Sequence, residues 1–374
     1  MMLLCYIFIF FALLQFLYYV LIFNKLVFYK NDILSNEQHK NLPVSIIICA
    51  QDEADNLKQF LPIIYKQNYP NFQVVLVNDR SVDSTFDVMQ SFKDKYPNQT
   101  YIVHVEFNNE QRFAGNKKYA LTMGIKGAKH EHLLFTDADC KPTSKDWLSI
   151  MSSRFTNKKQ LVLGYGKYQS IKNSLLNKLI RYETVQTALQ YFAYALKGMP
   201  YMGVGRNMAY TKKLFMDNNG FYSHLDILSG DDDLFVNEVA TPQNTSICLN
   251  KDAFTVSKPK TSWKSFIHQK RRHISAAGHY KWKHRLLLGT YYVSLIGFYS
   301  LAILLLILHT EWKIVLALVI ARFLYWFTIN YKTMQKLNEK GLILYLPILE
   351  VVLLLFQFYI FVLNLFKKPK YWTP

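Results

Sequence analysis

The sequence predicts an α/β domain built on a mostly parallel sheet, with membrane helices attached at both of its ends. Between residues 43 and 135, short apolar runs alternate with amphipathic stretches, which is the pattern of strand–helix–strand units. One long apolar segment precedes this region of the 374-residue chain, and two to three follow it. A basic, aromatic-rich segment at 258–285 comes before the C-terminal apolar segments, as expected for an amphipathic helix at the membrane interface.

The composition agrees with a membrane-attached protein. Lys and Arg number 44 against 26 Asp and Glu, and 51% of the residues are hydrophobic. This balance indicates membrane phospholipids as a partner. Nucleic acid is not expected as a partner, because no nucleic-acid-binding module is recognisable. The 4 cysteines fit neither a zinc site nor a disulfide framework, so the globular part is expected in a reducing compartment.

The N-terminal apolar segment, residues 1–23, is expected to be an uncleaved transmembrane anchor. It contains one polar residue, Gln15, and it is long enough for a hydrocarbon core of about 30 Å. A signal peptide would have a basic start and a small-residue cleavage site, and neither is present. Lys25 and Lys30 follow the anchor, so the positive-inside rule places the next segment in the cytoplasm. Residues 24–42 are expected to form a linker.

The α/β domain is expected to cover residues 43–257. Its expected strands are runs of β-branched and other apolar residues, at 44–50, 74–77, 101–105, 132–135 and 161–165. Its expected helices have apolar residues at 3.6-residue spacing and begin near Glu53, Asp83, Gly115, Trp147, Asn173 and Ser229. The glycine-punctuated stretch Met202–Tyr210 is expected to be extended.

The C-terminal region, 286–366, holds three apolar segments, at 286–308, 314–330 and 342–366. The second is marginal for a span and contains Arg322, whereas the third contains Pro347 and Glu350. An acid at membrane depth normally faces protein or a cavity. If every segment crosses, the basic tail at 367–374 lies outside, against the positive-inside rule. A re-entrant or interfacial last segment would resolve that conflict.

Acidic residues stand at the ends of the expected strands and at the starts of the expected helices. They are Asp52 and Glu53, Asp79, Asp137 and Asp139, and Asp231 and Asp232. In open α/β sheets, ligands bind at the carboxyl ends of the strands. Mg²⁺ prefers one or two carboxylates together with substrate phosphates, so Asp137 and Asp139 are candidates to hold a cation against a nucleotide diphosphate. Ending a strand and capping the next helix is the structural alternative.

Other residues near these acids suit the same site. Asp79 can accept a hydrogen bond from the base or ribose of a nucleotide, and Lys117, at a helix start, can approach the nucleotide. Arg272 can clamp a phosphate with its planar guanidinium. Asp232 can take the proton from an attacking hydroxyl. Three acids at a helix start also favour the helix dipole, so capping is the alternative role for 231–233.

Five motifs in this order resemble those of family-2 glycosyltransferases. They are Pro43–Ala50 with Glu53, Asn78–Thr85, Gly115–Leu121, Thr136–Asp139 and Gly230–Asp232. Gln269–His273 is similar to the Gln-x-x-Arg-Trp motif of the membrane-embedded members, which include cellulose and hyaluronan synthases and ceramide glucosyltransferase. The resemblance covers roughly residues 43–285.

The resemblance implies a Rossmann-like GT-A fold, a nucleotide-sugar donor, a divalent cation (Mg²⁺ or Mn²⁺) and inversion at the anomeric carbon. The donor-binding residues that it implies are Ala50, Glu53, Asp79, Lys117, Asp137, Gln269 and Arg272. It implies that Asp139, with Asp137, holds the metal. It implies Asp232 as the catalytic base, with Asp231 as the runner-up.

Some residues around the motifs depart from the family or have simpler expected roles. Asn78 stands where many members have Asp, which is expected to be tolerated. His273 replaces the Trp of the motif, which weakens the case for a processive synthase. Lys118 is expected to face solvent, and Lys270 and Arg271 are expected at lipid headgroups.

The expected function is sugar transfer to a hydroxyl of a lipid or lipid-linked acceptor at the cytoplasmic face of a bacterial inner membrane. One alternative is a processive synthase that extrudes a polysaccharide. The other is a non-enzymatic membrane subunit that binds a nucleotide-sugar and scaffolds a partner.

Overall fold

The computed structural model describes residues 1–30, 42–106, 117–227 and 229–366, and two sheets lie at its centre. The larger sheet has the strand order β3-β2-β1-β4-β8-β6-β9. Its strands are β1 (Val44–Ala50), β2 (Phe72–Asp79), β3 (Thr100–Val105), β4 (His132–Phe135), β6 (Leu161–Leu163), β8 (Met208–Thr211) and β9 (Thr245–Ile247). The smaller sheet contains β5 (Cys140–Pro142), β10 (Thr255–Ser257) and β7 (Gly166–Tyr168). β1 to β4 are parallel, and β8 runs antiparallel to its neighbours, so the expected mostly parallel α/β class is confirmed.

Helices cover both faces of the larger sheet, which explains why its central strands are apolar on both sides. The helices of this domain are α3 (Ala54–Ile64), α4 (Thr85–Lys95), α5 (Lys117–Gly127), α6 (Trp147–Ser152), α7 (Leu175–Leu196), α8 (Lys212–Asp217) and α9 (Asp233–Val239). Ile47 belongs to the core on the α5 side, whereas Ile48 packs with Leu57 of α3 on the other face. Gly124 lets α5 approach the sheet, because an added Cβ would lie 2.7 Å from Val77.

The expected extended stretch at Met202–Tyr210 is wrong in its middle. A 3₁₀ turn at Gly205–Asn207 precedes β8. The Asn207 amide explains the turn, because it donates to the backbone carbonyls of Tyr165 at 3.0 Å and Ala253 at 2.8 Å, and so draws the chain out of the strand.

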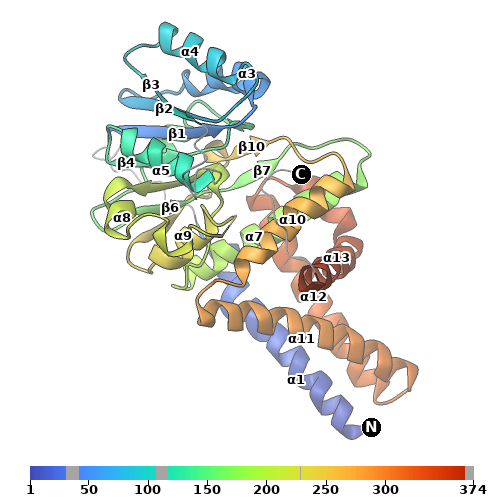
Figure 1. Ribbon diagram of the computed structural model, residues 1–374. Helices are drawn as coiled ribbons and strands as arrows, with labels where there is room; N and C mark the ends of the chain where they lie inside the picture. The colour runs from blue at the N-terminus through green and yellow to red at the C-terminus, as the bar shows by residue number, and fades with distance from the viewer. Residues whose placement is uncertain (31–41, 107–116, 228, 367–374) are drawn as a thin grey trace.

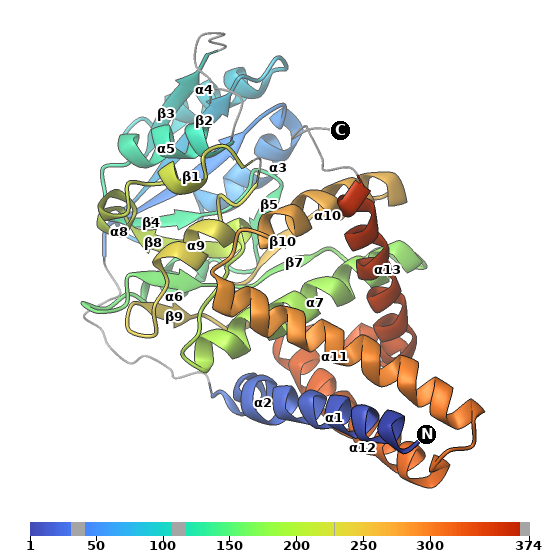
Figure 2. The same cartoon turned by 60° about the horizontal axis from the view of Figure 1, so that its bottom comes forward.

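Among the described residues, four helices are long and apolar enough to cross a membrane. One lies before the domain and three after it, which agrees with the expected one N-terminal and two to three C-terminal helices. The first is α1 (Met2–Tyr18), continued by a π-helical turn (Tyr19–Phe23) and α2 (Asn24–Phe28). The others are α11 (Trp282–Ile307), α12 (Trp312–Lys336) and α13 (Leu346–Phe366), the last preceded by a 3₁₀ segment (Lys340–Tyr345). Helix α10 (Trp263–Ala277) leads into them. Figures 1 and 2 show α1 and α11 projecting side by side from the sheet domain, with the N-terminus at the far end.

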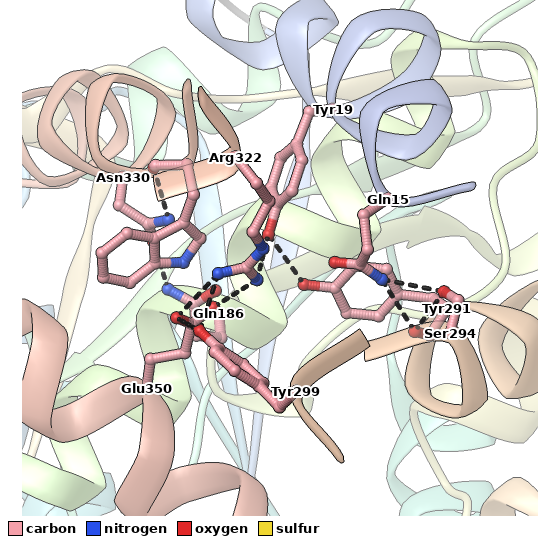
Figure 3. A network of polar contacts seen from close by, with 10 residues as sticks. Gln15, Tyr19, Gln186, Tyr291, Ser294, Tyr299, Arg322, Asn330 and Glu350 are labelled. Atoms are coloured by element: carbon pink, nitrogen blue, oxygen red, sulfur yellow. Dashed lines mark hydrogen bonds and ion pairs between the residues drawn. The ribbon is translucent and has the colours of Figure 1, made fainter. Parts of the chain in front are cut away.

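A buried ion pair joins α12 and α13 (Figure 3). Arg322 of α12 donates to both carboxylate oxygens of Glu350 of α13, at 2.6 and 3.0 Å. The hydroxyls of Tyr19 and Tyr299 accept from the same guanidinium at 3.1 and 2.8 Å. Of the two surroundings expected for an acid in an apolar segment, protein or a cavity, Glu350 has the first. Since each charge has its counter-charge, the cost of keeping either one out of water is offset.

The last apolar segment contacts helix α7 of the sheet domain at its start and α10 at its end. At its start, Tyr345 lies under Lys178 of α7, with the ammonium 4.2 Å from the ring centroid. At its end, Asn364 accepts from Arg271 Nε at 3.0 Å and donates to the Arg271 carbonyl at 3.0 Å. The segment therefore runs as one continuous helix, α13, between a contact to α7 at its start and a contact to α10 at its end.

Candidate active site

One cavity of about 1080 Å³ is lined by every residue that the sequence nominated for the donor, the metal or catalysis. Its polar end lies at the carboxyl ends of β1, β2 and β4, where Ala50, Glu53, Asp79, Lys117, Asp137, Asp139, Asp231, Asp232, Gln269 and Arg272 line it. These residues lie between positions 50 and 272. The parallel strands bring those that end or follow β1, β2 and β4 to one edge of the sheet, whereas Asp231 and Asp232 come from the start of α9, and Gln269 and Arg272 from α10. Among the acids expected at strand ends, Asp52 is not part of the cavity lining, and its carboxylate accepts from the Val82 N–H at 2.8 Å.

The nucleotide end of the cavity is built from the loops after β1 and β2. Asp79, the last residue of β2, accepts from Arg80 Nε at 2.8 Å. Burial raises the pKa of Asp79, although Arg80 opposes this effect. Thr85 Oγ1 accepts from the Glu53 N–H at 2.8 Å and so fastens the two loops together. Arg80 has a φ of +55°, a left-handed conformation that turns the chain sharply after the strand.

Lys117 joins two of the acids across the site. Its Nζ lies 3.0 Å from Asp137 Oδ1 and 3.1 Å from Asp231 Oδ2. Burial by itself lowers the pKa of Lys117, but the two carboxylates outweigh it and hold the pKa well above its usual range. Burial likewise favours the neutral form of Asp231, and Lys117 reverses this effect and lowers the pKa of that carboxyl. Asp231 is therefore held as a carboxylate, in an ion pair.

The Asp137–Asp139 pair fits a divalent cation. One ligand atom each from Asp137, Asp139 and Cys140 lies within 4.8 Å of the others. Burial and the neighbouring Asp137 charge both raise the pKa of Asp139. A cation between two carboxylates relieves this repulsion, and oxygen ligands of this kind suit Mg²⁺ and Mn²⁺.

The three acids at the start of α9 have different surroundings. Asp232 accepts from the backbone N–H groups of Gly205 at 2.8 Å and Asp233 at 2.7 Å, which are its hydrogen-bond partners in the described chain. Asp232 therefore caps α9, as the structural alternative holds, and also faces the cavity. Burial and then the charge of Asp231 raise the pKa of Asp232 to about 6. Asp233 instead accepts from the Tyr280 hydroxyl at 2.7 Å.

Helix α10 covers the cavity from the side opposite the strand ends. Gln269 and Arg272 line the cavity, and Gln269 Nε2 lies 3.5 Å from the Tyr168 hydroxyl. Burial lowers the pKa of Arg272, opposed by the charges of the nearby acids, of which Asp231 has the largest effect. His273, which replaces the family tryptophan, also lines the cavity.

Three expectations about lysine and arginine side chains are wrong. Lys118 is buried rather than solvent-exposed, because its Nζ donates to the His224 carbonyl at 2.6 Å. Lys270 pairs with Glu183 of α7 at 2.6 Å. Arg271 donates a hydrogen bond to Asn364 of α13. The last two side chains hold α10 onto its neighbours instead of reaching lipid headgroups.

Arg206 is a site residue that the sequence analysis missed. It lies in the 3₁₀ turn next to Gly205 and lines the cavity. Its guanidinium stacks on the Tyr168 ring, 4.2 Å from the ring centroid. No motif marked this position, although a cation among glycines before a strand was a usable signal.

The far end of the cavity is apolar and reaches α11 and α13. It is lined there by Leu288, Tyr292, Val293 and Ile296 of α11 and by Leu354, Phe356, Phe358 and Phe361 of α13. Val293, Phe358 and Phe361 are more than half exposed, so apolar side chains that line this end are also accessible from outside the molecule. Gln190 and Gln357 both line the same cavity and donate to the Tyr292 hydroxyl at 3.3 Å.

Comparison with known proteins gives both a family match and a fold match. The family model described as glycosyl transferase family 21 matches residues 7–373. Among solved structures, a mannosyltransferase from Pyrobaculum calidifontis in complex with GDP-Man and Mn²⁺ is similar, with a TM-score of 0.59 and 17% identity. The match covers 90% of this chain and 98% of that chain, and the expected GT-A fold is confirmed.

Curated relatives are similar over shorter stretches. A poly-β-1,6-N-acetyl-D-glucosamine synthase of Staphylococcus epidermidis is 25% identical over 112 residues, which is 30% of this chain and 25% of that protein. The UDP-Glc:α-D-GlcNAc-diphosphoundecaprenol β-1,3-glucosyltransferase of Escherichia coli is 30% identical over 96 residues, 26% of this chain and 35% of that protein. The chain therefore matches about a quarter to a third of the length of these two relatives.

Proposed function

The chain belongs to glycosyl transferase family 21, and from this premise we propose that it transfers a sugar from a nucleotide-sugar donor to a lipid or lipid-linked acceptor, with inversion. The observation that carries the proposal is the single cavity that joins the acid cluster to the apolar faces of α11 and α13. A donor at the strand ends and an acceptor from the bilayer meet in it beside Asp232.

The residues divide the chemistry among them. Asp79 and Glu53 contact the nucleotide, and Arg272 approaches the diphosphate from α10. Asp232 accepts the proton of the acceptor hydroxyl while that oxygen bonds to the anomeric carbon and the bond to the diphosphate breaks. Asp139, with Asp137, holds Mg²⁺ or Mn²⁺, which when bound neutralises charge on the departing diphosphate.

Attack from the side opposite the leaving group inverts the anomeric carbon, and a single base suffices for this reaction. Asp232 suits the base role better than its neighbours do. The pKa of Asp232, raised to about 6 by burial and the Asp231 charge, lies close to neutral pH, where a general base works best. Asp231 is held by Lys117, and Asp233 by Tyr280.

One relative supports a lipid-linked acceptor, and another supports a polysaccharide as an alternative product. The Escherichia coli relative is named for a diphosphoundecaprenol acceptor. The Staphylococcus epidermidis relative is named as a polymer synthase. We favour single transfer here because His273 removes the aromatic platform that processive members carry.

Narrowing the apolar end of the cavity tests the acceptor route. We expect Ile296→Trp to raise KM for the lipid acceptor about tenfold, equivalent to ~1.4 kcal/mol, because the indole fills the gap between α11 and α13. Release of nucleoside diphosphate by purified protein in detergent is measured with donor, Mn²⁺ and membrane lipid. Mass spectrometry of the lipid product then distinguishes one added sugar from a polymer ladder.

The matched control for this variant is Ile303→Trp. Ile303 lies seven residues further along the same face of α11, is exposed, and is not part of the cavity lining. It is expected to behave as wild type. Equal KM values for both variants would contradict a lateral acceptor route, and diphosphate release that never depends on lipid would contradict a lipid acceptor.

We also propose that α1, α11 and α12 cross the bacterial inner membrane, while α13 starts and ends on the cytoplasmic side. The contacts at the two ends of the last segment support this arrangement, which also resolves the conflict with the positive-inside rule. Phe366→Cys is expected to react with an impermeant thiol reagent in inverted vesicles only. Thr310→Cys, in the turn between α11 and α12, is expected to react in right-side-out vesicles only. Labelling of both variants in the same vesicles would contradict the arrangement.

A further inference from the structure

A chain of hydrogen bonds runs behind the candidate metal ligand Asp139. Arg206 donates from a terminal guanidinium nitrogen to Ser257 Oγ at 3.3 Å. Ser257 Oγ lies 2.8 Å from Cys140 Sγ, and Cys140 Sγ lies 3.3 Å from Asp139 Oδ1. Ser257 is 1% exposed and Cys140 is 2% exposed, so both middle members are shielded from water.

The chemistry of the two ends fixes the direction of the chain. A guanidinium only donates hydrogen bonds, and a carboxylate only accepts them. The thiol hydrogen of Cys140 therefore points at Asp139, and the hydroxyl hydrogen of Ser257 points at the sulfur. Every member donates toward the acid, an arrangement in which successive hydrogen bonds strengthen one another.

The backbone holds this chain in place. Cys140 of β5 and Ser257 of β10 are register partners in the smaller sheet, so their side chains meet because of strand pairing. The stacking of Arg206 on Tyr168 orients the first donor. A protein group also donates to Asp137, because its Oδ1 accepts from Lys117 Nζ at 3.0 Å. Each acid thus has one oxygen, Oδ1, occupied by a protein donor.

We propose that Cys140, Ser257 and Arg206 are positioning residues that hold Oδ1 of Asp139 and leave its second oxygen for the divalent cation. The inference rests on the proposed function only in that a cation binds at Asp137 and Asp139. Hydrogen bonds to the ligands of a metal commonly set ligand orientation, and their loss typically costs ~10–100-fold in metal affinity or activity.

Binding of Mn²⁺, measured by the loss of the free-ion electron paramagnetic resonance signal in the presence of UDP or GDP, tests the proposal without turnover. Cys140→Ala and Ser257→Ala are expected to weaken Mn²⁺ binding by ~10–100-fold. Cys140→Ser keeps a donor at the same place and is expected to restore binding to within about threefold of wild type, the difference between O–H and S–H donors being modest. Cys248→Ala is the matched control, because Cys248 is another buried free thiol of this domain that lies outside the cavity lining.

The outcomes separate this proposal from the proposed function. Wild-type Mn²⁺ affinity in folded Cys140→Ala would overturn it, as would an equal loss in Cys248→Ala. If Cys140→Ala does not fold, as judged by thermal unfolding, unchanged affinity in Ser257→Ala would overturn it equally. A wild-type protein that transfers sugar without binding Mn²⁺ overturns the positioning role and leaves the transfer standing. Weakened binding in the variants of a protein that modifies no lipid supports the positioning role and contradicts the transfer.

Discussion

Replacing Asp232 with asparagine is expected to slow sugar transfer by ~10²–10⁴-fold, the usual contribution of a general base. Affinity for the nucleotide is expected to stay unchanged. The amide keeps the size of the side chain, and its oxygen can still accept from the Asp233 N–H, so α9 stays capped while the proton acceptor is lost. Single-turnover rates and calorimetric binding of the nucleoside diphosphate separate these two effects.

The pH profile of the wild type gives an independent check on Asp232. A base acts as the carboxylate, so kcat/KM is expected to fall as pH drops through the pKa of Asp232, which burial and the Asp231 charge raise to about 6. The fall should approach tenfold per pH unit below that value. Asp231→Asn is the control, and it is expected to weaken the Lys117 contact without removing the base. If Asp231→Asn abolishes transfer and Asp232→Asn does not, Asp231 is the base.

The candidate site could be predicted from the sequence because several of its acidic residues lie at the ends of strands or at the start of a helix. Asp79 and Asp137 follow apolar runs, and parallel strands place such residues at one sheet edge whatever their separation in sequence. Asp232 opens a helix, which a capping pattern marks equally well. Local signals therefore sufficed to nominate residues that line one cavity.

The residues that were missed or misjudged depend on contacts between distant parts of the chain. Lys118 is buried because carbonyl groups from the segment before α9 accept from its ammonium, and nothing near position 118 announces this. Arg206 enters the cavity because a 3₁₀ turn interrupts a stretch that was expected to be extended. Lys270 forms an ion pair with Glu183 of α7, which lies 87 residues earlier in the sequence. A solvated lysine and a paired one look the same in sequence.

In the C-terminal apolar segments, too, a contact between distant residues could not be predicted from the sequence. Arg322 and Glu350 each made an apolar segment look doubtful as a membrane helix. Together they form one buried pair, 28 residues apart in sequence, with two tyrosine hydroxyls around it. The charges weaken the hydropathy of each helix, and the ion pair that they form joins α12 to α13.

Replacing Asp139 with alanine is expected to lower the transfer rate by about 10³-fold, or ~4 kcal/mol, and to weaken Mn²⁺ binding at the same time. The reason is that Asp137 alone would then face the cation, and one of its oxygens already accepts from Lys117 at 3.0 Å. Diphosphate release is measured over a titration of Mn²⁺ and of Mg²⁺. Treatment of the wild type with a chelator should give a similar loss, and either ion should reverse it.

Asp55→Ala provides the matched control, since Asp55 is an acid of the same domain whose side chain is fully exposed at the start of α3. It is expected to retain wild-type rates and metal dependence. Asp139→Asn is more discriminating than alanine, because it keeps an oxygen for the Cys140 thiol and removes the negative charge that attracts the cation. A rate for Asp139→Asn near that of Asp139→Ala would assign the effect to charge, and therefore to the cation. Full activity in both variants would contradict a metal role for Asp139, and a chelator-resistant wild type would extend that conclusion to the whole acid pair.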